Sequence, residues 1–506
     1  MPVPTIPIST DILIIGGGPA GSYAASTLAR GSFSSIPYRR KYAPFLPPFP
    51  AFHWGRGEGH SARLHSQAAV KLNQYKREGY TDFVSTDPNK AAWNVVRSEF
   101  DEILLRHSAE SGACVCEGVQ VTAIAFSADE SHRPVSAEWK SLLGNKGQIQ
   151  FNWLIDASGR TGMMSTKYLK NRKFNQALKN VAFWGYWTGA GSYGCGTKRE
   201  NAPWFEALTD ETGWAWFIPL HDGTVSVGVV LKDESSRLKR SKLAGTDINK
   251  THYLSQLNLA PGVLHLLGSA KLATEIKTAA DYSYSAAAYA GPNYRIAGDA
   301  GAFIDPFFSS GVHLAFSNAL SAASSIAASI RGHCTEAEAI KFHDSKTGTS
   351  YTRFMLVVLS IHRQITQQNA PVLSDVNEDN FDRAFDFLKP IIQGSADADN
   401  NITEGMLQRT MDFCEHALGP TTPEMHAAVA NRLEDPTLLA DKGPIMPPNE
   451  VEAIAGQDEE TKHVLWRVNA RKAVEGIYDW QSDLESSAVN GLGVVLERGR
   501  LGLQRV

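Results

Sequence analysis

The chain has 506 residues, a formal net charge of −4 and a pI of about 6.4. This slight acidity argues against nucleic acid or an anionic membrane as the main partner. No apolar run reaches the roughly 18 residues of a spanning helix. The first residues also lack the basic and apolar regions of a secretion signal. Five scattered cysteines fit a reducing compartment and predict no metal site, so we expect a cytoplasmic protein of two or three domains.

The first predicted unit is a strand over 11–15, a glycine-rich turn and an alanine-rich helix. Glycines in such a turn let the backbone approach a pyrophosphate, and the helix start supplies N–H donors and a positive dipole end. The turn predicts dinucleotide binding by Gly16, Gly17, Gly18, Ala20 and Gly21.

The next segment departs from that fingerprint. An acidic residue that holds the ribose is expected about 20 positions further on. Between Ser22 and Gly57, however, the chain has no Asp or Glu. Residues 31–62 are rich in Pro, Ser and Arg and show neither helical nor strand periodicity.

Regular elements return after this segment. An apolar stripe predicts a helix over 93–112, in which Arg97 near the start suits a pyrophosphate contact. Strands are predicted at 119–126, 149–156, 181–188, 213–220 and 224–231. Trp184, Trp187, Trp214 and Trp216 alternate on them, as is typical of a sheet with one side lining a cavity.

Two carboxylates follow predicted strands. Asp156 begins Asp-Ala-Ser-Gly-Arg at the end of an apolar run, and Asp299 follows the strand over 294–298. A small-residue helix is predicted over 311–330, and helical character continues from Cys334 to the C-terminus around a Gly/Pro-rich linker at 441–451.

Together the glycine turn, Asp-Ala-Ser-Gly and Gly-Asp-Ala resemble FAD-dependent enzymes of the glutathione-reductase-like, aromatic-hydroxylase type. The resemblance implies an α/β fold. A Rossmann-type FAD-binding domain would comprise 1–180 and 285–335, with 31–67 atypical. A β-rich substrate domain would comprise 181–284, and a helical C-terminal region 336–506. Asp299 would meet the ribityl hydroxyls, and the resemblance also assigns Val121 and Val312 to the cofactor site.

Another motif indicates one kind of enzyme within this class of FAD-dependent proteins. Gly213-Trp214-Ala215-Trp216-Phe217-Ile218-Pro219 resembles the W-x-W-x-I-P signature of flavin-dependent halogenases. The stretches KLNQYKREGYTDF, NVVRSEFDEILLRHSAE and DPFFSSGVHLAFSNAL resemble the fungal phenol halogenases that act on freestanding aromatic polyketides.

This resemblance implies a reaction and its residues. Reduced FAD, delivered by a separate NAD(P)H flavin reductase, would react with O2 to a hydroperoxide, which chloride or bromide attacks to give hypohalous acid. Halide would bind at Ser310 and Gly311, where a helix start favours an anion. Trp214, Trp216, Ile218 and Pro219 would line the passage, and Lys71 would direct the halogen to the substrate.

Two departures from the family qualify these expectations. Phe307 and Phe308 stand where tryptophan halogenases carry a Glu, which favours a phenol. Residues 31–67 lack the family's second strand with its acidic end, so we expect a splice or reading-frame error, or a decayed gene. The alternatives are therefore an FAD-dependent phenol hydroxylase, or an inactive flavoprotein that cannot hold FAD.

Overall fold

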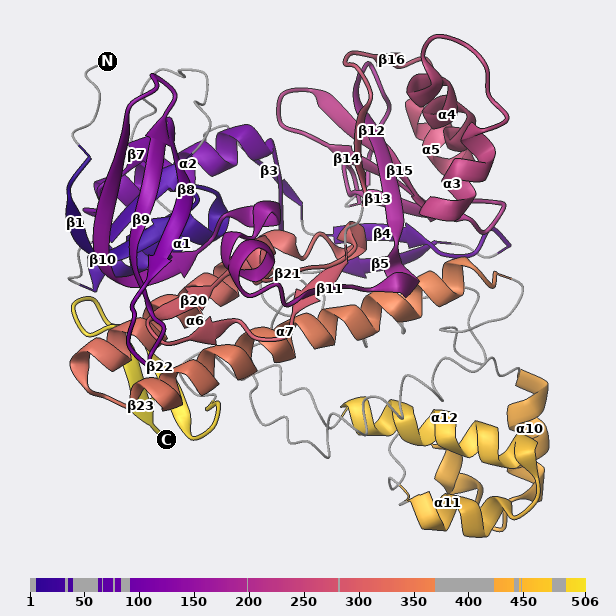
Figure 1. Ribbon diagram of the computed structural model, residues 1–506. Coiled ribbons are helices and arrows are strands. Elements are labelled where there is room, and N and C mark those ends of the chain that lie inside the picture. The colour runs from indigo at the N-terminus through magenta and orange to yellow at the C-terminus, as the bar shows by residue number, and fades with distance from the viewer. Residues whose placement is uncertain are drawn as a thin grey trace.

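Two large sheets joined by long helices make up most of the computed structural model (Figure 1). It describes residues 6–31, 35–39, 62–65, 67–75, 78–82, 92–197, 199–280, 283–368, 423–440, 446, 448–475 and 488–506. The strands and helices predicted from apolar runs are present, with ends shifted by a few residues.

The first sheet has a parallel centre. Its strand order is β19-β20-β10-β1-β2-β7, and β8 and β9 extend β10 in antiparallel fashion. The bounds are β1 (Ser9–Ile15), β2 (Ser35–Arg39), β7 (Cys116–Glu117), β8 (Val119–Phe126), β9 (Pro134–Ser141), β10 (Lys146–Asp156), β19 (Ala290–Gly291) and β20 (Tyr294–Ile296). Helices α1 (Pro19–Arg30), α2 (Arg97–Glu110) and α6 (Gly311–Arg331) belong to this part of the molecule, and α1 packs on both others.

The second parallel strand, expected to be missing, is present. β2 runs parallel to β1, with Ile14 opposite Pro37 and Ile15 opposite Tyr38, and it continues the ladder to β7. The expectation that 31–67 lacks this strand is therefore wrong for 35–39. The rest of the predicted atypical segment includes residues 40–61, which lie outside the described residues, so that part of the prediction is not tested.

The second sheet is mostly antiparallel, with the order β16-β12-β15-β14-β13-β4-β5, and β17 pairs with β12. The bounds are β4 (Gln67–Lys71), β5 (Gly79–Asp82), β12 (Asn180–Thr188), β13 (Trp204–Ala207), β14 (Gly213–Pro219), β15 (Thr224–Lys232), β16 (Lys271–Leu272) and β17 (Lys277–Ala280). One face packs on α3 (Asp233–Arg240), α4 (Ile248–Leu257) and α5 (Pro261–Leu267). Because β4 pairs with β13 and with β5, residues 67–82 belong to this sheet and not, as predicted, to the FAD-binding part.

Smaller strand groups complete the described sheets. β11 (Arg172–Phe174), β18 (Tyr284–Ala286) and β21 (Ala302–Phe303) form a three-stranded sheet, and β3 (Ala62–His65) pairs with β6 (Ala92–Val95).

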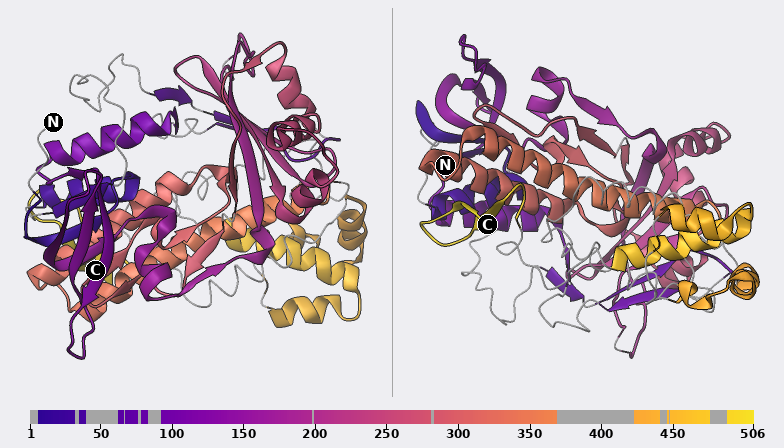
Figure 2. Two further views of the ribbon diagram at one scale, coloured as in Figure 1. Left: turned by 45° about the horizontal axis from the view of Figure 1, so that its top comes forward. Right: turned by 90° about the horizontal axis from the view of Figure 1, so that it is seen from below.

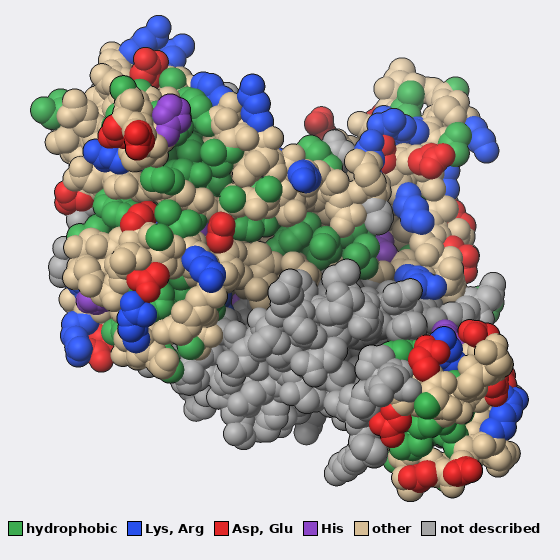
Figure 3. Space-filling view, turned by 60° about the horizontal axis from the view of Figure 1, so that its bottom comes forward, with side chains coloured by type: hydrophobic (Ala, Val, Ile, Leu, Met, Phe, Trp, Pro, Cys, Tyr) green, Lys and Arg blue, Asp and Glu red, His purple; other side chains and the backbone are tan. Residues whose placement is uncertain are grey.

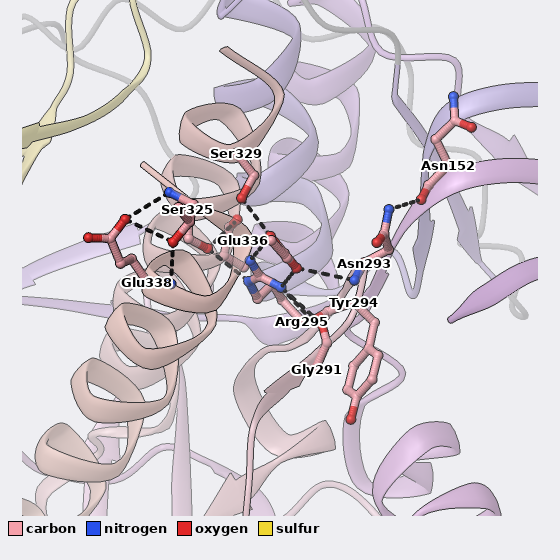
Figure 4. A network of polar contacts seen from close by, with 11 residues as sticks. Asn152, Gly291, Asn293, Tyr294, Arg295, Ser325, Ser329, Glu336 and Glu338 are labelled. Atoms are coloured by element: carbon pink, nitrogen blue, oxygen red, sulfur yellow. Dashed lines mark hydrogen bonds and ion pairs between the residues drawn. The ribbon is translucent and has the colours of Figure 1, made fainter. Parts of the chain in front are cut away.

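Helix α7 (Glu336–Ile365) runs from the first sheet to the second (Figures 1 and 2). A capping box of Thr335 and Glu338 starts it. Glu336, the first residue of α7, pairs with the fully buried Arg295 of β20 through both carboxylate oxygens, at 3.0 and 3.1 Å (Figure 4). Ser325 of α6 accepts a further hydrogen bond from Arg295, so one buried guanidinium joins β20, α6 and α7.

The C-terminal region is only partly helical. α10 (Pro423–Arg432) and α11 (Pro448–Ala455) both pack on α12 (Glu459–Glu475), to one side of the sheets (Figure 2). The prediction that helices continue to the end is wrong for the last residues, where β22 (Leu492–Val495) and β23 (Gly502–Arg505) form a hairpin on α6. Among the described residues, no helix is long and apolar enough to cross a membrane.

Candidate active site

The turn between β1 and α1 combines close packing with one open position. A Cβ on Gly16, where φ is +120°, would lie 2.0 Å from the Ala157 carbonyl oxygen, and one on Gly21 would lie 1.9 Å from the Gly16 oxygen. A Cβ on Gly18 would meet no described atom within 4 Å. Gly18 is also the N-cap of α1, and Pro19 follows it. The turn therefore leaves free space at a helix N-terminus, where a pyrophosphate would fit.

The carboxyl ends of three parallel strands meet beside this turn. Ile15 of β1 is level with Asp156 of β10, which is level with Ile296 of β20. Gly298 follows β20, and a Cβ there would contact the Cβ atoms of Ala20 and Ala315 at 3.1 and 3.5 Å. The glycine turn, the Gly-Asp motif and the start of α6 thus lie together at this edge, where ligands of open α/β sheets bind.

Asp299 is a half-buried carboxylate among positive charges. It lies in the 3-10 turn η5 (Gly298–Ala300), and burial raises its pKa to about 6. Arg97, Arg160 and Arg172 counteract that rise. Arg172 was not predicted, and it donates to the Asp299 and Ala300 carbonyls at 3.4 and 3.1 Å. This group offers both a hydroxyl acceptor and charge complementary to phosphate.

Arg97 is where the prediction put it, as the first residue of α2. It is exposed and pairs with Asp101 at 3.0 Å, so its side chain is held at the outer margin of the site.

Asp156 has an internal role. It is fully buried and accepts hydrogen bonds from the backbone N–H groups of Ser158 and Met164, at 3.0 and 2.6 Å. Burial raises its pKa, and these donors oppose the rise. It therefore shapes the loop that packs against Gly16.

The predicted halide residues lie at the N-terminus of α6. Ser310 is the N-cap, is 3% exposed, and its hydroxyl has no partner among the described residues. The first turn of α6 contains no acidic residue, and Gly311 and Val312 are half-buried. A buried, unpartnered hydroxyl at a 21-residue helix start is a suitable donor set for an anion.

The W-x-W-x-I-P motif forms β14, and its Trp side chains share one face. Trp214 is 1% exposed and packs edge-on against Phe307 at 4.9 Å, 5.7 Å from Trp216. Ile218 and Trp184 pack against the same cluster, and Pro219 ends the strand. Trp187 stands three residues from Trp184, so its side chain lies on the opposite face, where it donates a hydrogen bond to the Tyr253 hydroxyl. The prediction that all four Trp side chains share one side is therefore wrong for Trp187.

Lys71 ends β4 on the other face of this sheet. It is in register with Glu206 of β13, which is in register with Ala215 of β14. Ala215 packs with the α4–α5 cluster, whereas Trp214 and Trp216 pack with Phe307. The structure therefore brings the Trp pair next to Phe307, in the loop before the predicted halide residues, but does not bring Lys71 to the face of that pair.

Several polar contacts near the site have no signal in the sequence. His362 lies 3.2 Å from Asp305, a fully buried carboxylate that also accepts hydrogen bonds from Asn180 and from the Phe307 N–H. Gln368 bonds the loop after Lys71. These partners come from distant parts of the chain, so only covariation among relatives could have indicated them.

Val121 is 3% exposed in a core cluster that also holds Ile15 and Ala300. Its side chain is therefore a packing residue rather than a lining one. No cluster of metal-binding side chains was found among the residues that the structure describes.

The chain is similar to known proteins over most of its length. The sequence model of the family described as Tryptophan halogenase matches residues 56–388. Flavin-dependent halogenase armH1 of Armillaria mellea is 53% identical, over 99% of this chain and 99% of its own length. Sulochrin halogenase gedL of Aspergillus terreus is 40% identical, over 99% of this chain and 94% of its own length.

Solved structures match at the level of the fold. The myxobacterial chondrochloren halogenase CndH, described as a variant of FAD-dependent halogenases, has a TM-score of 0.61 and 23% identity. The match covers 77% of this chain and 90% of that one. The alignment with armH1 spans 526 positions, more than the 506 residues here, so it includes gaps in this chain.

Proposed function

Because the chain belongs to the tryptophan halogenase family and is a flavin-dependent halogenase, we propose that it chlorinates or brominates a phenolic polyketide. The observation that carries this proposal is the close approach of Gly298 to Ala20 and Ala315, where a Cβ on Gly298 would lie 3.1 and 3.5 Å from their Cβ atoms. It joins the glycine turn of a dinucleotide site to the helix start that holds Ser310. Cofactor and halide would thus be held side by side.

We propose that the described residues would hold FAD in a glutathione-reductase-like arrangement. The open space at Gly18 and the N-terminus of α1 would receive the pyrophosphate, with Arg97 and Arg172 nearby, and Asp299 would accept a hydroxyl hydrogen bond. Bound reduced FAD and O2 would supply the oxidising equivalent that turns halide into hypohalous acid. The FAD-binding part would comprise 6–39, 92–180 and 285–335, and the substrate part 67–82 and 181–284.

For the halide, we propose Ser310 as a hydroxyl donor and the backbone of Gly311 and Val312 at the α6 start. The dipole end of the helix favours an anion without a buried Lys or Arg. Trp214, Trp216 and Phe307 form an apolar wall beside this place, which supports a role in keeping water and substrate away from it.

Lys71 remains the proposed director of the halogen. Its support is the sequence match, and it stands at the strand end, where a long side chain can reach past the rim of the sheet. Because the Trp pair lies on the opposite face, the passage would lead around the end of β4. A Lys71→Met variant should lose substrate halogenation by about a hundredfold while halide-dependent FADH2 oxidation persists. Lys76→Met is the control, and equal halogenation by K71M and wild type would refute this role.

A phenol is the proposed substrate because Phe307 and Phe308 supply no carboxylate, so the ring must be activated by its own hydroxyl. A relative that is 40% identical is described as a sulochrin halogenase, which supports a freestanding small-molecule substrate. A separate reductase would supply FADH2, and the C-terminal region would cover the substrate. The test is an assay with FAD, a flavin reductase, chloride or bromide, and a panel of phenolic polyketides plus tryptophan. Halogenation of phenols is expected, and halogenation of tryptophan alone would refute the substrate class.

A hydroxylase on the same scaffold is the alternative function, and a halide-independent hydroxylated product would favour it. Loss of FAD binding through 31–67 would make the chain an inactive flavoprotein. Sequencing the transcript across that segment tests the origin of its unusual composition, since a transcript that encodes it as written excludes a gene-model error.

A further inference from the structure

The residues that follow the C-terminus of α7 are hydrogen-bonded to the loop that follows Lys71. Gln368, three residues beyond the helix, is 2% exposed and uses both its backbone and its side chain. Its Oε1 accepts from the Gln74 N–H at 2.9 Å, and its carbonyl accepts from the Asn73 side-chain amide. Two consecutive residues just past Lys71 are thus bonded to one buried glutamine.

The same glutamine reaches the turn between β13 and β14. Its Nε2 donates to the Leu208 carbonyl at 2.7 Å, and its N–H donates to the Glu211 carboxylate at 2.8 Å. The Gln368 side chain accepts one of these hydrogen bonds and donates another, which its amide group can do. A Glu side chain lacks the donor, and a Met side chain lacks both groups.

From this loop the network continues to Glu206, the register partner of Lys71. Gln74 donates to Glu206 at 2.9 Å and to the Ala207 carbonyl at 2.6 Å. Glu206 is fully buried and also accepts the Gly262 and Val263 N–H groups at the start of α5. The strand end at Lys71 is therefore held by α7 on one side and by β13 and α5 on the other.

We propose that Gln368 is a positioning residue that fixes Lys71 relative to the cofactor site. The proposal rests on the directing role proposed for Lys71. At its other end α7 is anchored to the cofactor-binding sheet by the Arg295–Glu336 pair. Its 30 residues correspond to roughly 45 Å of rigid helix between the two places. The Gln368 side chain is the contact through which this helix sets the end of β4.

Gln368→Met tests the proposal, because it keeps the size of the side chain and removes both bonds. The control is Gln367→Met, since Gln367 is exposed. The measured quantity is halogenated product per FADH2 oxidised, together with the hypohalous acid that escapes to an added scavenger, monochlorodimedone. We expect Q368M to lower the product yield at least about fivefold and raise the escaping oxidant, whereas Q367M changes neither. FAD affinity and halide KM should stay as in the wild type.

A purely structural role would give a different result. If Q368M lowers FAD binding, flavin oxidation and thermal stability together, with unchanged product per FADH2, the positioning role is wrong. Should Q368M fail to fold, Gln368→Glu keeps the length and one acceptor, and it should show the same loss of yield. An unchanged yield in folded Q368E also overturns the proposal.

A double variant separates this proposal from the one on which it rests. If Gln368 acts through Lys71, K71M with Q368M should be no worse than K71M alone. A further loss in the double variant would overturn the action through Lys71. If K71M keeps full yield, the directing role of Lys71 fails by itself, whatever Q368M does, and the positioning of Lys71 fails with it.

Discussion

The buried hydroxyl of Ser310 is the residue whose change should affect halide most specifically. Because it has no partner among the described residues, Ser310→Ala removes a donor without leaving another group unsatisfied. We expect halide KM to rise roughly fivefold, equivalent to about 1 kcal/mol for one hydrogen bond, with FAD affinity unchanged. The measurement is the initial rate against chloride concentration. Ser309→Ala is the exposed control, and equal KM values for S310A and wild type would contradict the assignment.

Asp299 should make the stability of the apoprotein depend on pH. Its pKa is about 6 when folded, against an ordinary 3.8, so the folded state binds more protons between these values. The free energy of unfolding therefore falls as pH rises from about 4 to about 6, by about 3 kcal/mol from this group. Asp299→Asn should remove that fall. Urea unfolding at about pH 4 and about pH 7 checks it, and an identical pH dependence in D299N and wild type would exclude this cause.

At the residue scale, the sequence led to Asp299 through the Gly-Asp motif after a strand, and the family resemblance led to Ser310. The roles assigned to both residues remain predictions. Arg172 and Gln368 could not be named, since the contacts that place them at the site are with Asp299 and Leu208, each more than a hundred residues away.

The strand-turn-helix element β1–α1 allows a test with two variants, because Gly16 is required by close packing whereas Gly18 borders open space. Gly16→Ala should lower the melting temperature and yield, because its Cβ would overlap the Ala157 carbonyl and φ is positive. Gly18→Ala should fold normally but bind FAD at least about tenfold more weakly, because the methyl group enters the space proposed for pyrophosphate. Thermal unfolding and FAD titration of both variants measure this. Tight FAD binding by G18A would contradict the assigned place of the cofactor.

The elements found from periodicity were those with clear apolar runs, and the failures have physical reasons. β2 was missed because Ser35-Ile36-Pro37-Tyr38-Arg39 is short, does not alternate, and contains a proline, which usually argues against an inner strand. The hairpin β22–β23 has strands of only four residues. The place of β4 depends on pairing with β13, some 130 residues away, which no local pattern encodes.

At the scale of the whole molecule, the resemblance predicted an FAD-binding domain and a separate β-rich domain. Two large sheets are present, and the binding of FAD beside the first remains a prediction. On the face in Figure 3, acidic and basic side chains of the described residues are interspersed, without a large patch of one sign among them. Sequence could not predict that Lys71 and the Trp pair face opposite sides of one sheet. That relation depends on strand register, in which a shift of one residue exchanges the faces.

The most direct measurement of the central claim is the mass spectrum of the product formed when the purified protein receives reduced FAD, O2, chloride and a phenolic polyketide. The account predicts a product that carries the isotope doublet of one chlorine, that requires both FADH2 and chloride, and that is absent with Lys71→Met. A product that has gained oxygen and no chlorine, formed equally without chloride, would contradict it.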